Sequence, residues 1–436
     1  MASSGLDYFR FDRSAAVLCR IGRDGLGGPE LIPLARKLIA ILLLMLSGCL
    51  LWYSISTYKL SGQSRLADFS ARFFPEALIL DGNSRYRALD SAGAEESYKQ
   101  AILAGPSFVD AWIGLARAQL GNGQIDQTRE TLNIISPALT SISAWKRSEL
   151  LLAYDLHDES YFEQCFNYIL SYLPHRVEEA GLLASQFWGG WPQVVPHVLS
   201  YNRPVLMGLL INGQQADTAL DVFNIMQKEG ANWEDRDLLR LCDFLISKDR
   251  FKEAKEVWRI FRKNDLSFIH DGGFEQAPLN MAFGWRVPTN TDFVVERTTD
   301  APYSGKFCLH AHFKGTGNVD ANLAYQVVPV DSGASYTLRF VRKSRNLTTD
   351  RGVYVMVYGF KFKGEFSVKS GQVLGDSPWK EEEIQFTVPS GCEAIVLQVL
   401  RDQSLKMDNK ISGDYWLDSV ELDKSVISTN SITKYN

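Results

Sequence analysis

The stretch AEESYKQAILAGPSFVDAWIGLA, residues 94–116, decides the fold of the middle of the chain. Its small residue Ala94 is followed by Tyr98 and Ala101, so the three side chains lie on one helical face. Pro106 ends that helix, and a second apolar stripe begins after it. The second stripe consists of Trp112, Leu115 and Ala116. A small residue lets two antiparallel helices approach closely while an aromatic fills the groove beside it, so the stretch predicts a packed helix pair.

The same spacing recurs along the chain, which indicates a repeat rather than a single helical hairpin. The next copy starts 34 residues after Ala94, a third starts a further 37 residues on, and the last two are 35 residues apart. The later copies are Thr128, Leu132 and Ile135; Cys165, Ile169 and Tyr172; Ala219, Phe223 and Met226; and Ala254, Trp258 and Phe261. Residues 175–201 depart from the pattern, and we interpret them as a degenerate unit.

These residues resemble tetratricopeptide repeats, a family in which paired helices stack into a solenoid. The resemblance implies that residues 75–266 form an α-solenoid whose concave surface binds a protein partner. The repeated side chains themselves are core positions, so they do not identify that partner.

An apolar stretch lies near the start of the chain, LIAILLLMLSGCLLWYSI from Leu38 to Ile55, and it contains no charged residue. Arg36 and Lys37 precede it, and Trp52 lies near its end, as is typical of the two boundaries of a bilayer. The stretch predicts a single membrane-spanning helix over residues 38–57, with membrane lipid as a partner. The alternatives are a buried core helix and a cleaved signal peptide, and the long preceding segment disfavours the second.

The basic residues around this segment predict its orientation. Four of them precede it and three follow it, which favours a cytoplasmic tail over residues 1–37. A linker over residues 58–74 and the rest of the chain would then lie outside the cytoplasm. Leu46-Ser47-Gly48-Cys49 resembles the lipobox of bacterial lipoproteins, which would lipidate Cys49. The long leader and the apolar residues that continue through Trp52 argue against lipidation.

After Asp265 the pattern changes from helical periodicity to short alternating runs broken by Gly, Pro, Asn and Asp. The runs predict strands whose alternate residues share a face. These faces are Tyr336, Leu338, Phe340 and Arg342; Val353, Val355 and Val357 opposite Tyr354, Met356 and Tyr358; and Ile395, Leu397, Val399 and Arg401. The pattern predicts a two-sheet β-sandwich over residues 267–424, with a tail over residues 425–436. The fold class is therefore multidomain, α plus all-β.

A second resemblance rests on motifs of this β region. They are Asp271-Gly272-Gly273-Phe274-Glu275, Gly284-Trp285, Ser304-Gly305-Lys306 and Tyr415-Trp416-Leu417-Asp418. Their order and spacing resemble the jelly roll of carbohydrate-binding modules of the family 4/9 type. The whole arrangement is similar to membrane-anchored repeat proteins of bacterial extracellular-polysaccharide gene clusters. This resemblance implies polysaccharide as a ligand and the bacterial inner membrane as the location.

The resemblance also implies site residues. Sugars bind to aromatic platforms flanked by a few polar groups. The glycan-binding candidates are Tyr354, Tyr358, Trp379, Gln326, Arg342 and Arg401. Modules of this type often hold a structural calcium ion, and the corresponding positions are Glu275, Gly305, Lys306 and Asp418. The alternative at that place is a metal-free hydrogen-bond cluster, so no cofactor is required.

Other functions find little support in the sequence. The formal net charge is −5, which leaves no basic excess for nucleic acid. There is no GxSxG, HExxH or phosphate-binding glycine loop. The six cysteines form no CxxC pair and are interpreted individually, mostly as small core residues, with pairing of Cys308 and Cys392 in an oxidising compartment as the alternative. His310 and His312 share a strand face without a third ligand at metal spacing. Glu381-Glu382-Glu383 is interpreted as a solvated strand edge.

These patterns predict a non-enzymatic, membrane-anchored scaffold. Its repeats would bind a protein and its sandwich a glycan, in the assembly or export of extracellular polysaccharide. The alternatives are an adaptor that binds proteins only, with a structural sandwich, and a glycan-processing enzyme, which would need two carboxylates facing one cleft.

Overall fold

The computed structural model describes residues 38–51, 74–139, 143–263, 267–348, 350–362, 364–406 and 409–425. The chain divides into two compact units, Met1–Cys165 and Phe166–Asn436. The predicted tail over residues 1–37, the end of the predicted membrane segment, the linker up to residue 73 and the tail from residue 426 lie outside the described residues.

Residues 38–51 form a helix with exposed side chains. In the part of the chain that the structure describes, no helix is both long enough and apolar enough to cross a membrane.

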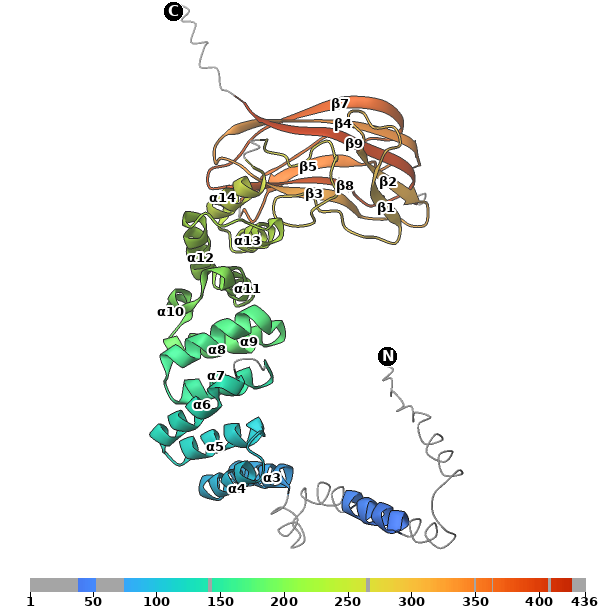
Figure 1. Ribbon diagram of the computed structural model, residues 1–436. Helices are drawn as coiled ribbons and strands as arrows, with labels where there is room; N and C mark the ends of the chain where they lie inside the picture. Colours follow the sequence, from blue (N-terminus) through green and yellow to red (C-terminus); the bar gives the residue numbers. More distant parts are fainter. Residues whose placement is uncertain are drawn as a thin grey trace, which may run out of the picture. The chain divides into compact units, whose positions relative to one another are not determined.

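The first unit consists of antiparallel helix pairs (Figure 1). Its helices are α3 (Pro75–Arg87), α4 (Ser91–Ala104), α5 (Val109–Gly121), α6 (Ile125–Leu139) and α7 (Lys146–Asp155), which follows the short helix η2 (Ser143–Trp145). The next helix, α8 (Glu159–Tyr172), contains the division between the units.

Tyr98 shows why small residues alternate with aromatics in this unit. Its ring is 2% exposed, and it fills the space left by two glycines on neighbouring helices. An ideal Cβ would lie 2.7 Å from the Tyr98 ring at Gly82 of α3, and 2.3 Å from it at Gly114 of α5. The Tyr98 hydroxyl donates to Asn83 Oδ1 at 2.9 Å. The aromatic position of the predicted repeat is therefore a packing position.

We expect Gly114→Ala to destabilise the first unit by about 1–3 kcal/mol, because the new methyl group overlaps the Tyr98 ring in a filled core. Gly208→Ala on α11 is the matched control, since its nearest outside atom is Arg240 Nη1 at 3.7 Å. Gly208→Ala replaces a glycine that weakens the helix, so we expect it to raise the free energy of unfolding by about 0.5–1 kcal/mol. Urea unfolding of both variants measures the difference, and equal effects at the two positions would contradict the packing argument.

The second unit begins inside α8, continues with α9 and several short helices, and then returns to helix pairs. Over the stretch predicted to be degenerate it has η3 (Pro174–Arg176), α9 (Val177–Trp188), α10 (Trp191–Val194), η4 (Val195–His197) and η5 (Ser200–Asn202). The pairs that follow are α11 (Arg203–Asn212) with α12 (Ala216–Lys228), and α13 (Asp235–Ser247) with α14 (Phe251–Phe261). Their small residues Ala219 and Ala254 are fully buried, as the spacing predicted.

The same unit continues into a β-sandwich, which confirms the predicted two-sheet fold of this region (Figure 1). Its strands are β1 (Phe293–Thr298), β2 (Cys308–Lys314), β3 (Ala321–Pro329), β4 (Ser335–Leu347), β5 (Tyr354–Gly359), β6 (Ser367–Lys369), β7 (Gly375–Thr387), β8 (Ala394–Arg401) and β9 (Ser412–Lys424). One sheet has the order β1-β2-β9-β4-β7 and the other the order β3-β8-β5-β6, with antiparallel pairing in both.

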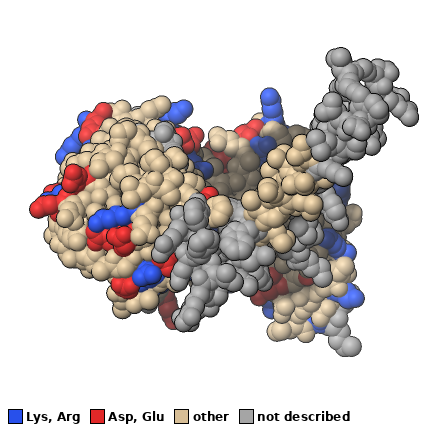
Figure 2. Space-filling model, turned by 60° about the horizontal axis from the view of Figure 1, so that its bottom comes forward, with Lys and Arg blue, Asp and Glu red and all other residues tan. Residues whose placement is uncertain are grey.

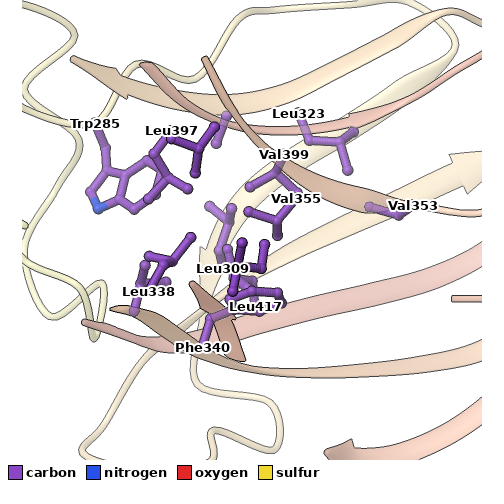
Figure 3. Packing of buried hydrophobic residues seen from close by; sticks show 14 of the residues in the cluster. Trp285, Leu309, Leu323, Leu338, Phe340, Val353, Val355, Leu397, Val399 and Leu417 are labelled. Carbon is purple, nitrogen blue, oxygen red and sulfur yellow. The ribbon is translucent and has the colours of Figure 1, made fainter. Parts of the chain in front are cut away.

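The core lies between the two sheets, where alternate residues of each strand meet. Figure 3 shows leucines and Phe340 of the five-stranded sheet facing valines and leucines of the four-stranded sheet. Trp285 closes one end of this cluster, 2% exposed, with its Nε1 donating to the Asp271 carbonyl at 3.2 Å. The Gly-Trp motif singled out in the sequence is thus a core element.

Within the second unit, the last helix pair packs on the sandwich. Asp243 of α13 accepts a hydrogen bond from Arg286 at 2.7 Å, and the Ser247 carbonyl at the end of α13 accepts one from Lys361 Nζ at 2.8 Å. The ring of Phe251 on α14 lies 5.9 Å from that of Phe360, which follows β5. These contacts support one end of the four-stranded sheet from its outer side.

Candidate functional site

The outer face of the four-stranded sheet is set by the alternation of its strands. Val355 of β5 and Leu397 of β8 point into the core. Their neighbours Met356 and Gln398 therefore point outward, where both are half-buried rather than buried. The outer face thus carries side chains that do not take part in the packing of the core.

Five outward residues form one line across this sheet, which we call the transverse row. Strand register pairs Arg286 with Tyr325, Tyr325 with Gln398, Gln398 with Met356, and Met356 with Lys369. Residues paired directly across antiparallel strands share a face. At about 4.8 Å between strands, the row spans roughly 19 Å. It presents a cation at each end, with an aromatic ring, an amide and a thioether between them.

Tyr358 lies two residues after Met356 on β5 and points to the same face, beside the transverse row. Its ring is half-buried, and its pKa is raised by burial first and then by the nearby hydroxyl of Tyr325. The neighbouring positions across the strands, Val327 and Val396, are each only 2% exposed although they point outward. They lie toward the end of the sheet where Phe360 meets α14, so Tyr358 marks the border of the open face.

On the other side of the row, Tyr354 is held by polar neighbours. It is 2% exposed, its hydroxyl donates to Asp402 Oδ1 at 2.7 Å, and Lys369 Nζ lies 5.1 Å above its ring. Burial first, and then the bond to Asp402, raise the pKa of Tyr354. Tyr354 therefore positions Lys369 rather than offering a free ring face.

Arg286 ends the row beside the helices. Its guanidinium lies 5.7 Å from the centre of the Tyr325 ring, and its Nη2 donates to Asp243 of α13 at 2.7 Å. Such a row can stack on a ring and hydrogen-bond to hydroxyl groups. The arrangement can therefore contact a ligand that carries rings and hydroxyl groups.

The structure places the six glycan-binding candidates in three locations. Tyr354 and Tyr358 lie on the outer face described above. Trp379 lies on β7 of the other sheet, where its ring is 5.8 Å from that of Tyr303. The remaining three, Gln326, Arg342 and Arg401, point toward the interior and are at most 2% exposed.

The three interior candidates are bonded within the protein. Gln326 donates to the His270 carbonyl at 3.0 Å and accepts from the His270 amide at 3.2 Å. Arg401 donates to the carbonyls of Arg351 and Val319. Arg342 pairs with Glu382 at 2.5 Å. The bonds of Gln326 and Arg401 hold loops to strands, and the Arg342–Glu382 pair joins β4 to β7, so the three side chains have structural roles.

Sequence reasoning missed Tyr325, Gln398, Met356, Lys369 and Arg286. The alternation already placed Met356 outward with Tyr354, and Gln398 lies between the inward Leu397 and Val399. Tyr325 was hidden by a register shift between Asn322 and Ala324, which interrupts simple counting along β3. No local signal identified Arg286, because its partner Asp243 is 43 residues away in the sequence.

The four calcium candidates do come together, in a cluster of hydrogen bonds. Glu275 Oε1 accepts from the amides of Lys306 at 2.8 Å and Phe307 at 3.1 Å. Asp418 Oδ2 accepts from the amides of Tyr303 at 2.9 Å and Ser304 at 3.0 Å. Gly305 has a positive φ of 64°, and a Cβ there would overlap Glu275 Oε1.

The environment of these carboxylates fits amide donors better than a metal ion. Backbone hydrogen bonds from Lys306 and Phe307 lower the pKa of Glu275. Burial raises the pKa of the fully buried Asp418, although its backbone hydrogen bonds act in the opposite direction. Calcium requires six to eight oxygen ligands, and here N–H groups point at the oxygens that it would use. These are the hydrogen bonds that the metal-free alternative predicts, and calcium binding stays a prediction.

Other clusters of polar residues are also internally paired. Asp414 accepts from His310 at 3.0 Å and from His312 at 2.8 Å, and no group of three or more His, Cys, Asp or Glu side chains in the described ranges is arranged to hold a metal ion. Cys308 and Cys392 are both free thiols. Figure 2 shows basic and acidic residues interspersed over the described part of the face that it presents.

Comparisons with known proteins concern the β-sandwich. No family model matches the chain, and no curated protein matches it. Among solved structures, a "Family 16 Carbohydrate Binding Module-2" is 18% identical over 36% of this chain and 99% of its own, with a TM-score of 0.27. TmCBM61, solved with β-1,4-galactotriose, is 18% identical over 36% of this chain and 99% of its own, with a TM-score of 0.26.

A third solved structure is the CBM22-1 xylan-binding domain of Paenibacillus barcinonensis Xyn10C. It is 16% identical over 35% of this chain and 91% of its own, with a TM-score of 0.26. The C-terminal β-sandwich thus resembles carbohydrate-binding modules. Similarity of this extent assigns no ligand to the chain.

Proposed function

We propose that the sandwich binds polysaccharide along the transverse row, and that the chain is a non-enzymatic scaffold. The observation that carries the proposal is the row itself, because its five outward side chains are in register and separate from the core. A glycan lying across the strands would stack on Tyr325 and Tyr358 and hydrogen-bond to Gln398 and Lys369.

The helical part of the chain supplies a second surface in this proposal. A pocket of about 600 Å³ lies among α9, α11 and α13, with Trp233, Arg236 and Asp237 among its lining residues. We assign a protein partner to this surface, since neighbouring repeats build a continuous groove that suits an extended chain. The partner itself is not specified by these side chains.

The remaining element of the proposal is membrane attachment through the helix of residues 38–51. Its leucines are 58–71% exposed, including Leu44 at 71%, so this apolar surface is not buried by described residues of the chain. Exposed apolar surface of this kind is stable in lipid. The scaffold would therefore act at a bacterial inner membrane, with the repeats and sandwich outside the cytoplasm, in the assembly or export of extracellular polysaccharide.

We expect Tyr325→Ala and Tyr358→Ala each to weaken retention of the full-length chain on its polysaccharide about tenfold, because each removes one stacking surface. Tyr303→Ala is the matched control, since Tyr303 is 52% exposed and belongs to the other side of the sandwich. Affinity electrophoresis against a panel of bacterial polysaccharides measures retention.

Two outcomes would oppose this proposal. If no polysaccharide retains the wild-type chain, the sandwich is structural and the adaptor alternative holds. If retention occurs but Tyr303→Ala weakens it while Tyr325→Ala does not, the glycan binds to the five-stranded sheet instead.

A further inference from the structure

A pocket lies beside β1, the strand at the end of the five-stranded sheet (Figure 1). Its volume is about 330 Å³, and residues 293–297 of β1 line it. The other lining residues are Leu309 of β2 and residues of the segment 278–290. The pocket shares no residue with the transverse row or with the pocket among α9, α11 and α13.

The hydrogen bonds around β2 fix the direction of each backbone group of β1. Where the register of β1 and β2 continues beyond the strands, the Lys314 amide donates to the Asp292 carbonyl at 3.2 Å. Hydrogen-bonded pairs recur at every second residue of an antiparallel ladder, and the residues between them direct their N–H and C=O groups to the other side. On the far side of β2, the Gly315 amide donates to the Ile411 carbonyl at 2.9 Å, which agrees with this alternation.

Three residues of β1 therefore direct their N–H and C=O groups out of the sheet, and we call them the β1 edge: Phe293, Val295 and Arg297. Among described residues, no hydrogen bond outside the ladder uses these backbone groups. The segment that shares the pocket cannot extend the ladder at Pro278 or Pro288, because proline has no N–H. The backbone groups of the β1 edge are thus available for another strand.

The pocket beside the β1 edge reaches the apolar core. Phe293 and Leu309 belong to the core cluster and are each 2% exposed, and Val287 and Val295 pack against that cluster. A strand added beside β1 would direct every second side chain to the same inward side as Val295. Apolar side chains at those positions would enter the pocket and extend the core.

The outward side of β1 carries a charge that can select such a strand. The Glu296 side chain is 61% exposed, and the nearest basic group in its ion pair, His310 Nδ1, lies 3.8 Å away. A residue directly across from Glu296 on an added strand would have its Cβ about 5 Å away, which suits lysine or arginine. A charged residue on an edge strand also discourages pairing, but it does so least for a strand of complementary charge.

We propose that the β1 edge binds an extended peptide segment of a protein partner, which joins the five-stranded sheet as a further strand. Each residue of an extended backbone supplies one donor and one acceptor, as the repeat along the β1 edge requires. The segment has apolar residues on its inward side and a basic residue across from Glu296. The inference goes beyond the proposed function, because this surface is independent of a glycan on the transverse row and of a partner on the repeats.

Fluorescence anisotropy of blocked, labelled peptides with the full-length chain tests the proposal. The lysine peptide alternates valine with threonine and has lysine at the central threonine position; the glutamate peptide has glutamate there. The methylated peptide is the lysine peptide with methyl groups on the backbone amides that would donate to β1. We expect affinity to fall about threefold for the glutamate peptide and at least about tenfold for the methylated peptide. Failure of the lysine peptide to bind, or equal binding of the methylated peptide, would overturn the proposal.

Variants of β1 locate the site. Val295→Pro removes one N–H of the β1 edge without removing a bond to β2, so it should weaken binding of the lysine peptide about tenfold. Val295→Ala is the matched control, because it shortens the same side chain and keeps the N–H. Glu296→Lys should reverse the preference between the lysine and glutamate peptides. Equal affinity of Val295→Pro and Val295→Ala, or an unchanged preference in Glu296→Lys, would contradict the site. Circular dichroism of each variant confirms that the sandwich remains folded.

Discussion

Glu382→Gln is expected to destabilise the sandwich by about 3–5 kcal/mol, because it leaves the Arg342 guanidinium charged and unpaired in the core. Arg342 is 2% exposed, and its Nη2 donates to Glu382 Oε1 at 2.5 Å. Its Nη1 donates to the Gly371 carbonyl at 2.8 Å, so it cannot reach water without breaking a second bond. Urea unfolding of the full-length chain, followed by near-ultraviolet circular dichroism, measures the loss.

Two further variants show whether the effect comes from burial of the charge. Arg339→Gln on β4 removes exposed pairs with Glu383 of β7 at 3.3 Å and Asp423 of β9 at 2.7 Å, and should change stability little. The double change of Arg342→Met with Glu382→Leu should keep most of the stability, because no unpaired charge remains. A Glu382→Gln midpoint equal to that of the wild type would refute this account of the pair.

The alternation of residues along the β-strands predicted which side chains face the core, but not which of them form a site. The predicted face of Tyr354, Met356 and Tyr358 is the outer face of β5, and Val355 and Val357 are core residues. The sequence also placed Arg342 on the same strand face as Leu338 and Phe340. Because those two residues belong to the core, Arg342 on that face is buried as well. A charged residue on such a face is more consistently explained by an internal pair than by a ligand.

Contacts between distant parts of the chain account for what sequence periodicity missed. Repeat spacing predicted the buried positions of α13 and α14, because those depend on residues three and four apart. Asp243 binds Arg286, and residues of α14 line a pocket together with Phe268. Both contacts depend on how the last helix pair packs on the sandwich. Both the end of the transverse row and the pocket that Phe268 lines arise where the last helix pair contacts the sandwich.

The sandwich therefore has two kinds of surface beside the helices. Four residues of its transverse row lie on strands, whose register fixes their positions. The fifth, Arg286, is held by an isolated bridge to Tyr325 and by Asp243 of α13. The pocket that Phe268 lines exists only where α14 and the sandwich are in contact. Loss of the last helix pair should remove the second surface and, through Asp243, loosen one end of the first.

Asp418→Ala is expected to lower the free energy of unfolding by roughly 3–5 kcal/mol, because three backbone amides lose their acceptor in the interior of the sandwich. Asp418 is fully buried, and its carboxylate accepts from Tyr303 at 2.9 Å, Ser304 at 3.0 Å and Ser419 at 2.6 Å. Asp418→Asn keeps one acceptor oxygen and should cost less. Urea unfolding at fixed pH ranks the two variants, and a larger loss for asparagine than for alanine would contradict the role assigned to the oxygens.

The loss of stability in Asp418→Ala should depend on pH, and the shifted pKa of Asp418 gives the direction of that dependence. Burial is the first cause that raises the pKa of Asp418, so the folded state binds its proton more readily than the unfolded chain does. Its contribution to stability is then complete below the unfolded pKa of about 3.9 and declines as the pH rises through the folded pKa. The loss of stability in Asp418→Ala should accordingly be greater near pH 4 than at neutral pH.

Added calcium should leave the wild-type unfolding temperature unchanged, since backbone amides already donate to the carboxylate oxygens of Asp418 and Glu275. A rise that Asp418→Ala abolishes would instead place a metal ion between Asp418 and Glu275.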